Sequence, residues 1–441
     1  MNKKISVSVA ITIAIIAMTV TFSVTMILAM QIFDNTVTSV NEKQSMYNKL
    51  SEIDKYVRAN GYNEINDNTL YDYIAYGYML GINDKNAKYY TEKEYSELLG
   101  IQSGKIMGIG VELIKDASTG YGRVVKVYTG SPAAELGIEV GSYITKIGET
   151  ATKSLTRDAM LARLRGENGV TVNLTYLTPA TNEEKTVDVN HYSYSAPTVD
   201  YQLVNEKLGY IRITQFVTTT TRELDYALNE LVKQGAAALV FDLRDNEGGL
   251  LNTALESADL LCAGGPLAYA EYRGGTQEVL QEADDAKIDL PVVCLVNGNT
   301  ASAAELFAAS LRELNEAKLV GTKTYGKGTI QAAPQRLSDG SAVVVTVAKL
   351  LTGKGESFDG TGLAVDQEVT LAENTTLYDY TLEEDAQVQK ALSVAVTLAG
   401  IGPSDSDSGS DASSDADSQP DGGDAGADEG SDTGSDAGGE G

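Results

Sequence analysis

The sequence contains only one histidine, His191, among its 441 residues. A catalytic Ser-His-Asp or Cys-His site, or a metal site built on imidazole, would have to use this residue. His191 stands in "DVNHYSYS", a link between two segments of different pattern, and is a poor candidate for a catalytic base. A general base therefore has to come from another residue type.

Cysteines and basic residues are also scarce. Of the two cysteines, Cys294 lies in the apolar run "PVVCLVN" and Cys262 ends a helix-like stretch, and we expect two buried thiols. A disulfide between them remains an alternative, because sequence alone cannot bring two side chains together. The chain has 34 basic against 62 acidic residues, a formal charge of −28. Such a surface repels phosphates, which argues against a nucleic-acid partner.

Large apolar residues are missing from the C-terminal stretch, residues 403–441. This stretch holds 12 acidic residues and no Lys or Arg, so the other 50 acidic and 34 basic residues leave a charge of −16. Nothing in it can offset the entropy of ordering, and we predict a disordered acidic Ser/Asp/Gly tail. Calcium binding is the alternative, but the acidic residues do not follow the spacing of a calcium loop.

Charge is absent from residues 5–33, which follow Lys3 and Lys4. About 20 apolar residues suffice for a helix that crosses a bilayer. The leading lysines favour a cytoplasmic N-terminus. Residues 1–34 are therefore predicted to be a cytoplasmic N-terminus with a single transmembrane helix, and the body would lie outside the cytoplasm at the cell membrane. A cleaved signal peptide is the alternative.

Residues 35–102 have the spacing of helices. An apolar face is predicted in "MYNKLSEIDKYV", at Met46, Leu50, Ile53 and Val57. "TLYDYIAYGYML" is predicted to form a second helix. "TEKEYSELLG" has the form of a capping box and is predicted to end at its glycine. We expect these faces to serve packing and assign no chemistry to this N-terminal helical segment.

Residues 103–190 show short strands and turns instead. The stretch "SPAAELGIEVGSYITKIG" resembles the PDZ domains of bacterial proteases, and Ser131 is expected to cap a short helix. Such a domain binds a C-terminal peptide as an added strand, with the carboxylate held by backbone N–H groups. The residues expected to do so are Gly108, Ile109, Gly110 and Val111. A simple tight turn is the alternative for these glycines.

Residues 191–402 alternate strands with helices. "AAALVFDLRD" and "LPVVCLVNG" are continuously apolar strands, and "TTRELDYALNELVKQG" and "SAAELFAASLREL" are helices. Apolar strands that alternate with helices indicate an α/β layer with a largely parallel sheet.

The stretch "GTKTYGKGTIQ" begins like a phosphate-binding loop, but Gly328 follows Lys327 where the pattern needs Ser or Thr. The sequence after Lys327 contains a β-branched pair and then Pro334, so no helix is expected to start there. A nucleotide site is therefore not favoured. Lys327 is better suited to act as a base, since burial favours the neutral amine. A solvated loop lysine is the alternative.

Ser302 follows a buried strand and opens a helix in "VNGNTASAAELFAASL". Such a serine is often a helix cap, but its place also suits a nucleophile, with the Ala303 N–H facing an oxyanion. A serine nucleophile needs a base, and Lys327 can supply it. Gln331, four residues beyond Lys327, could hold the amine through a neutral hydrogen bond.

Taken together, these motifs resemble the carboxy-terminal processing proteases, the S41 family of serine peptidases with a Ser-Lys pair. The motifs that carry the resemblance are "GYIRITQF", "FDLRDNEGGLL", "NGNTASAAELFAASL", "GTKTYGKGTIQ" and "DGSAVVVTVAKLLT". The resemblance implies an α/β protease domain of the ClpP/crotonase-like type with an inserted-style PDZ domain. It implies no metal and no cofactor.

The resemblance also implies roles for single residues. The nucleophile would be Ser302, the base Lys327 and the assisting residue Gln331. The oxyanion hole would use Gly248, with Gly249 as the alternative, together with Ala303. The sequence departs from the family at Glu247, where proline is usual, and this concerns the substrate groove more than the chemistry.

We therefore predict a membrane-anchored serine endopeptidase that binds the exposed C-terminal tails of protein substrates. A homodimer is possible, and no nucleic acid is expected. There are two competing predictions. One is a tail-binding scaffold without catalysis, and the other is an acyl-CoA enzyme. The chain is therefore expected to have five parts. These are the N-terminus with its transmembrane helix (1–34), the N-terminal helical segment (35–102), the PDZ domain (103–190), the peptidase domain (191–402) and the acidic tail (403–441).

Overall fold

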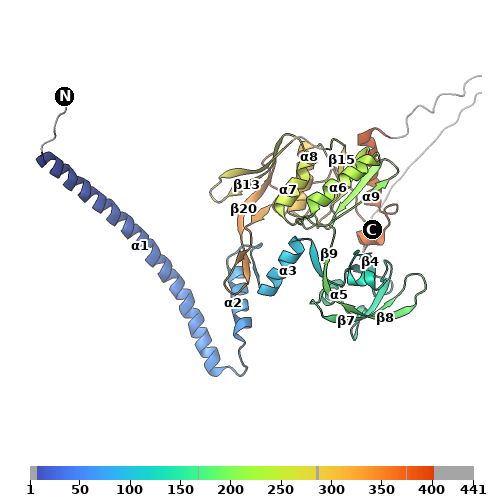
Figure 1. The fold of residues 1–441 in the computed structure, drawn as a ribbon, viewed down its shortest axis with the longest axis horizontal. Coiled ribbons are helices and arrows are strands. Elements are labelled where there is room, and N and C mark those ends of the chain that lie inside the picture. Colours follow the sequence, from blue (N-terminus) through green and yellow to red (C-terminus); the bar gives the residue numbers. More distant parts are fainter. Residues whose placement is uncertain (1–6, 167, 285–287, 374, 402–441) are drawn as a thin grey trace, which may run out of the picture.

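The structure is a computed structural model that describes residues 7–401, apart from 167, 285–287 and 374. The predicted acidic tail, 403–441, lies outside the described residues. Figure 1 shows a long N-terminal helix that extends away from two packed bodies, a smaller β-rich one and a larger α/β one.

The larger body, which we call the α/β domain, is built on a six-stranded sheet with the order β10-β11-β12-β15-β16-β21. Only β10 runs antiparallel to its neighbour, as the apolar strands and intervening helices predicted. Its strands are β10 (Val199–Val204), β11 (Leu208–Ile213), β12 (Ala238–Asp242), β15 (Val292–Val296), β16 (Lys318–Gly321) and β21 (Gln367–Glu368).

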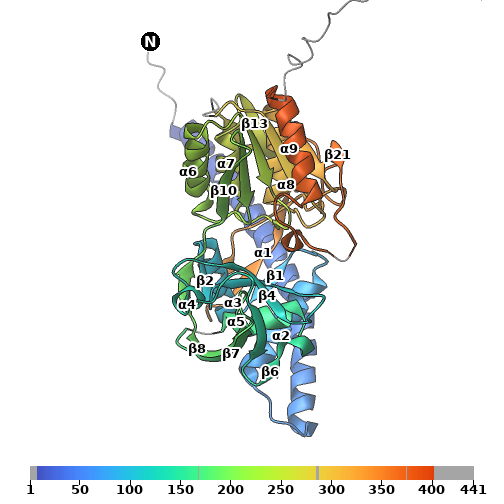
Figure 2. The same ribbon diagram turned by 90° about the vertical axis from the view of Figure 1, so that its right-hand side faces the viewer.

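Helices cover both faces of this sheet, and each face has its own apolar core (Figure 2). One core lies under α6 (Thr220–Lys233), α7 (Leu251–Asp259) and α8 (Ala303–Leu314). The other lies under α9 (Ala386–Ala399). The helices predicted from "TTRELDYALNELVKQG" and "SAAELFAASLREL" are thus confirmed as α6 and α8.

A second sheet of four strands, in the order β14-β13-β20-β17, packs beside α7 and α8. A further sheet has three strands in the order β1-β19-β18, of which β18 and β19 lie between β17 and β20 in the sequence. The strands are β13 (Gly265–Tyr272), β14 (Gln277–Ala283), β17 (Thr329–Gln331), β20 (Thr346–Thr352), β1 (Lys88–Tyr90), β18 (Gln335–Arg336) and β19 (Ala342–Val344).

The smaller body, which we call the small β domain, spans residues 109–190 and has a separate core around Leu113, Ile144 and Leu174. A short helix α4 is capped by the Ser131 hydroxyl, as predicted. The domain contains β3 (Val111–Lys115), β4 (Gly122–Val127), α4 (Pro132–Glu135), β5 (Tyr143–Ile147), β6 (Thr150–Ala151), α5 (Arg157–Arg165), β7 (Thr171–Leu177) and β8 (Glu184–Asn190). The strands β2 (Lys105–Gly108) and β9 (Tyr192–Ser195) pair where the chain enters and leaves it.

Tyr378 joins the two bodies. Its hydroxyl accepts a hydrogen bond from Arg212 of β11 at 2.9 Å and lies 3.3 Å from the Glu112 carboxylate of β3. Its carbonyl oxygen accepts from Arg123 of β4 at 3.0 Å. One residue of the C-terminal part therefore contacts the main sheet and the edge strand of the small β domain.

The N-terminal part forms α1 (Val7–Asn60), α2 (Asp67–Gly81) and α3 (Glu92–Gln102). The capping box at the start of α3 is confirmed, although α3 ends two residues beyond the predicted glycine. The predicted packing face of α1 is wrong, because Met46, Ile53 and Val57 are exposed. Helical spacing predicts the helix, but a covering partner is needed to bury its face.

The stretch expected to cross a membrane belongs to α1, which runs without a break into polar sequence up to Asn60. Among the residues that the structure describes, no helix is both long enough and apolar enough for a membrane span. The predicted transmembrane helix is therefore not found.

Candidate active site

Three loops at the carboxyl ends of neighbouring parallel strands carry the candidate catalytic residues. Gly248 follows β12, Ser302 follows β15, and Lys327 follows β16. Ligand and reaction sites of α/β sheets form at this edge, because successive loops converge there. Positions far apart in the sequence are brought together by the order of the strands.

Ser302 stands at the first turn of α8, where the backbone is strained. Its φ of 58° and ψ of −120° lie in a region that side chains rarely adopt. The buried Thr300 holds this turn, since its hydroxyl donates to the Leu243 carbonyl at 2.8 Å. Backbone strain of this kind persists only where the surroundings enforce it, and it is typical of a nucleophile on a strand-to-helix turn.

The fully buried carboxylate of Glu305 ties the serine loop to the lysine loop. It accepts the Ser302 N–H at 2.9 Å and the Lys327 N–H at 2.8 Å. It also accepts the Gly326 N–H at 2.7 Å and the Thr324 hydroxyl at 2.6 Å. Because charge-assisted bonds are short and directional, this one side chain fixes the backbone of both candidate catalytic residues.

The glycines around Lys327 allow a close approach to residues 358–362. A Cβ on Gly326 would lie 2.7 Å from the Gly362 nitrogen, and one on Gly328 would lie 2.7 Å from the Asp359 nitrogen. Strand β17 follows, and not a helix, which confirms the prediction against a phosphate loop. Gly328 is therefore required by packing.

Lys327 is half-buried, and its pKa is lowered, first by burial and then by the positive charge of Lys88. Glu247 acts in the opposite direction. A lowered pKa increases the fraction of neutral amine, the form that accepts a proton. The effect of burial follows from the sequence, but the two charged neighbours of Lys327 do not.

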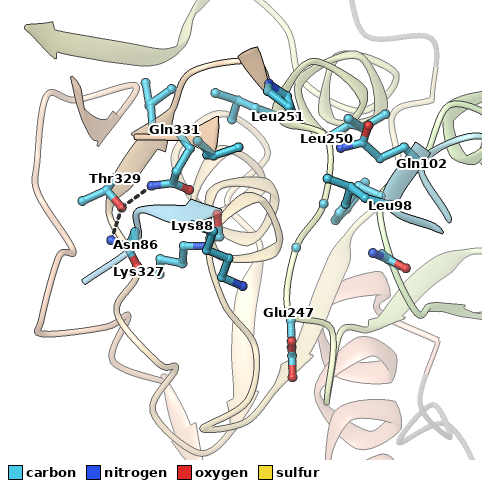
Figure 3. A pocket seen from close by; sticks show the side chains of 18 of the residues that line it. Asn86, Lys88, Leu98, Gln102, Glu247, Leu250, Leu251, Lys327, Thr329 and Gln331 are labelled. Carbon is cyan, nitrogen blue, oxygen red and sulfur yellow. Dashed lines mark hydrogen bonds between the residues drawn. The ribbon is translucent and has the colours of Figure 1, made fainter. Parts of the chain in front are cut away.

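Gln331 reaches the same site from β17. Its amide nitrogen donates to the Thr329 hydroxyl at 2.9 Å, and that hydroxyl also accepts from Asn86 at 2.9 Å (Figure 3). The amide is thereby oriented by groups from two different segments.

Gly248 packs directly against the serine turn. A Cβ on this residue would lie 3.0 Å from the Ala303 nitrogen and 3.1 Å from the Ser302 Cβ. Its own N–H, however, donates to the Asn246 side-chain oxygen at 2.8 Å. The expected oxyanion donor is therefore engaged within its own loop, and the absence of a side chain at Gly248 permits its close approach to the serine turn.

These residues line one cavity of about 670 Å³. Ser302, Lys327, Gln331 and Gly248 all face it, and apolar side chains such as Leu251 form part of the wall. Figure 3 shows Lys88 and Lys327 on the side that carries Gln331, with Glu247 on a separate segment. The cavity combines a serine, a partly buried amine and apolar surface.

The predicted peptide-binding loop lies at the start of β3, an edge strand of the small β domain. Gly108 and Gly110 have positive φ, as a tight turn requires. The Ile109 N–H is not free, because it donates to the Leu164 carbonyl at the end of α5 at 3.2 Å. Farther along β3, Arg157 of α5 donates to the Leu113 carbonyl at 2.9 Å. Helix α5 thus forms hydrogen bonds with the Ile109 N–H and the Leu113 carbonyl, two backbone groups that an added strand would need.

Three further sequence expectations concern residues away from the cavity. His191 is buried in contact with Gly166 of the small β domain and does not line the cavity. Cys262 and Cys294 are buried free thiols, as expected, without a disulfide. In the part of the chain that the structure describes, no group of three or more His, Cys, Asp or Glu side chains could hold a metal ion.

Comparison with known proteins identifies the family to which the chain is related. A family model described as peptidase family S41 matches residues 207–369. The chain is 34% identical over 306 residues to a carboxyl-terminal-processing protease of Synechocystis, covering 68% of this chain and 71% of that protein. It is 32% identical over 319 residues to the carboxy-terminal processing protease CtpA of Bacillus subtilis, covering 72% and 68%.

A solved structure from Bacteroides fragilis, named as an S41 protease, has a TM-score of 0.50 at 20% identity and supports the fold alone. It covers 73% of this chain and 88% of that chain. The chain is thus a serine-type peptidase. It belongs to peptidase family S41, and it is a carboxy-terminal processing protease.

Three residues that contribute to the site are not predicted from the sequence. Glu305 was visible as the fourth residue of a Ser-x-x-Glu pattern, a signature of a helix start. Asn246, which orients the Gly248 loop, and Lys88, which comes from the N-terminal part, gave no such signal. Asn246 is held by the distant Ile213 carbonyl, and Lys88 lies far from Lys327 in the sequence, so local patterns do not encode their positions.

Proposed function

We propose that Ser302 is the nucleophile and Lys327 the general base of this peptidase. The observation that carries the proposal is the Glu305 carboxylate, which fixes both residues at the wall of one cavity. The strained backbone of Ser302 and the lowered pKa of Lys327, caused chiefly by burial, support the two roles.

In this mechanism the neutral Lys327 amine takes the proton of the Ser302 hydroxyl while Oγ attacks the peptide carbonyl carbon. When the tetrahedral intermediate collapses, the C–N bond breaks and Lys327 gives that proton to the leaving amine. A water molecule, deprotonated by the same lysine, then attacks the acyl ester and restores Ser302. Gln331 would hold the amine through its carbonyl oxygen, since its nitrogen is engaged by Thr329.

The oxyanion would accept hydrogen bonds from Ala303 and Gly249. Ala303 is the first residue of α8, where backbone N–H groups and the helix dipole favour negative charge. The Gly248 N–H is engaged by Asn246, so the alternative donor, Gly249, becomes the better assignment. Gly248 would keep the oxyanion position open.

We propose that the small β domain acts as a PDZ domain and binds the C-terminal tails of protein substrates. Strand β3 is an edge strand, and Gly108, Ile109, Gly110 and Val111 lie at its start. A tail would add to β3 as a further strand, with its carboxylate at this turn. Binding requires α5 to release Ile109 and Leu113.

We propose that the protease acts outside the cytoplasm at the cell membrane. The support is the sequence alone, namely the uncharged residues 5–33 behind two lysines. Cell fractionation followed by protease treatment of intact cells tests this location. Protection of the body from external protease would contradict it.

The function is tested with the purified chain and a fluorescently labelled unfolded protein such as casein. Ser302→Ala and Lys327→Ala should each abolish cleavage, while circular dichroism and melting temperature stay as in the wild type. Full activity of a folded Lys327→Ala variant would overturn the assignment. A folded wild type that binds tailed peptides without cutting them would instead favour the tail-binding scaffold.

A further inference from the structure

A segment far from the S41 family match enters the active site. Residues 84–90 precede the matched region by more than one hundred positions in the sequence, yet Asn86, Lys88 and Tyr90 line the catalytic cavity. They come from the part of the chain that the sequence analysis assigned to packing alone.

Hydrogen bonds fasten this segment to the strands around Gln331. The Asp84 carboxylate accepts the Thr346 N–H at 2.7 Å and the Thr346 hydroxyl at 2.9 Å. The Asn86 amide donates to the Thr329 hydroxyl at 2.9 Å, the group that also receives Gln331. The segment is thus attached to β20 and to β17.

Strand pairing fixes the position of Lys88 itself. Strand β1 pairs antiparallel with β19, and Lys88 stands opposite Val344. The next side chain, Tyr89, is buried and donates its hydroxyl proton to Asp72 of α2 at 2.6 Å. Because side chains alternate along a strand, burial of Tyr89 turns Lys88 toward the cavity side.

A second cation therefore stands beside Lys327 (Figure 3). The other ionisable groups around Lys327 are Glu247 and Asp245 on the Gly248 loop, and Tyr90 on β1. Glu305 and Asp359 are also near, but they accept backbone N–H groups of Lys327 and Gly328. Lys88 opposes a proton on the Lys327 amine, and Glu247 favours one.

We propose that Lys88 is a positioning residue that favours the neutral, proton-accepting amine of Lys327 through its own positive charge. The inference rests on the role of Lys327 as the base, proposed above. The N-terminal part then belongs to the catalytic machinery, because Asp84 and Asn86 hold this charge in place. Two charges at the cavity therefore act in opposite directions. Lys88 favours the neutral amine of Lys327, and Glu247 favours the protonated amine.

The test compares the pH dependence of casein cleavage at low substrate, which reports kcat/KM, in the full chain and its variants. Activity rises with pH as Lys327 loses its proton. Without the Lys88 charge this rise should move to higher pH, because the amine then holds its proton more tightly. Lys88→Met should therefore lose about fivefold at pH 7 and recover toward wild-type activity at pH 10.

Two controls separate charge from structure. Lys88→Arg keeps the charge and should retain the wild-type profile, and Lys85→Met, in the same segment but outside the cavity, should leave it unchanged. High salt should move the wild-type profile toward that of Lys88→Met, since Lys88 is exposed and its charge can be screened.

An equal loss at every pH, an unshifted profile, or Lys88→Arg that behaves like Lys88→Met would overturn the inference. These results differ from failure of the proposed function. In that case Lys327→Ala stays active, whatever Lys88 does.

Discussion

The catalytic cavity and the small β domain both use backbone N–H groups, but in opposite ways. In the α/β domain a buried carboxylate, Glu305, accepts the N–H groups of Ser302 and Lys327 and leaves both side chains at the cavity. In the small β domain the Ile109 N–H is taken by the end of α5. The proposed catalytic residues are thus held in place, whereas a peptide could add to β3 in the proposed way only after α5 releases the Ile109 N–H.

This difference matches the demands that the two proposed functions would make. A transition state is stabilised by groups fixed in advance, so a permanent tether such as Glu305 is useful. A tail-binding strand edge has to exchange partners, and a contact with a neighbouring helix can be replaced. The structure therefore predicts large effects from changes in the tether and small ones from changes in the helix contact.

Glu305→Gln should break the tether and give the largest effect. In the wild type both carboxylate oxygens accept hydrogen bonds. In the variant an amide NH2 replaces one of these oxygens, so the buried donors that it faces lose their acceptor. We expect kcat for casein cleavage to fall about 100-fold with KM little changed, and the protein to lose about 1–3 kcal/mol of stability. Glu256→Gln, at an exposed position of α7, is the matched control. A variant with wild-type kcat would show that the tether is dispensable.

Gly248→Ala should fill the space in front of the Ala303 nitrogen. The new methyl group would lie 3.0 Å from that nitrogen, where the oxyanion is expected. Loss of one oxyanion donor costs about 100-fold in kcat, and we expect a loss of that order or somewhat smaller. Steady-state cleavage measures it, with binding of an uncleaved tailed peptide as the control. Unchanged kcat would place the oxyanion elsewhere.

Tyr378→Phe should weaken the contact between the two bodies. It changes no residue that lines the cavity with Ser302 and none at the start of β3. The variant loses the hydroxyl that bonds Arg212 and lies near Glu112. A buried hydrogen bond contributes about 1 kcal/mol, so the melting temperature should fall by roughly 2–4 °C. Tyr71→Phe, whose side chain is exposed, should leave it unchanged. An unaltered melting temperature of Tyr378→Phe would mean that this hydroxyl does not hold the bodies together.

Arg157→Ala should have the smallest effect, and in the opposite direction. It frees the Leu113 carbonyl on the edge of β3, so an added strand gains an acceptor. We expect a fluorescent decapeptide with an apolar C-terminus to bind about threefold more tightly, because the Arg157 guanidinium no longer competes for that carbonyl. Arg163→Ala on the exposed side of α5 is the control. Weaker binding would show that Arg157 contacts the peptide itself.

The same contrast explains what the sequence could predict. The helices α6 and α8, the apolar strands, and the positions of Ser302 and Lys327 at strand ends follow from local patterns and from convergence of loops in a parallel sheet. These features depend on periodicity and topology, which a single sequence encodes.

Other features depend on contacts between distant segments. Nothing local indicates that Lys88 reaches Lys327, that α5 covers Ile109, or that the apolar face of α1 stays exposed. The Gly248 N–H could not be assigned either, because the position of Asn246 depends on a hydrogen bond to Ile213 in another strand. Such contacts arise only once the chain has folded.

The central claim is that Lys327 activates Ser302. Reaction with a serine-directed fluorophosphonate, followed by peptide mapping, tests it most directly. We predict one adduct, on Ser302, which forms faster as pH rises and at least 100-fold more slowly in folded Lys327→Ala. An adduct on another residue, or an unchanged rate in Lys327→Ala, would contradict the claim.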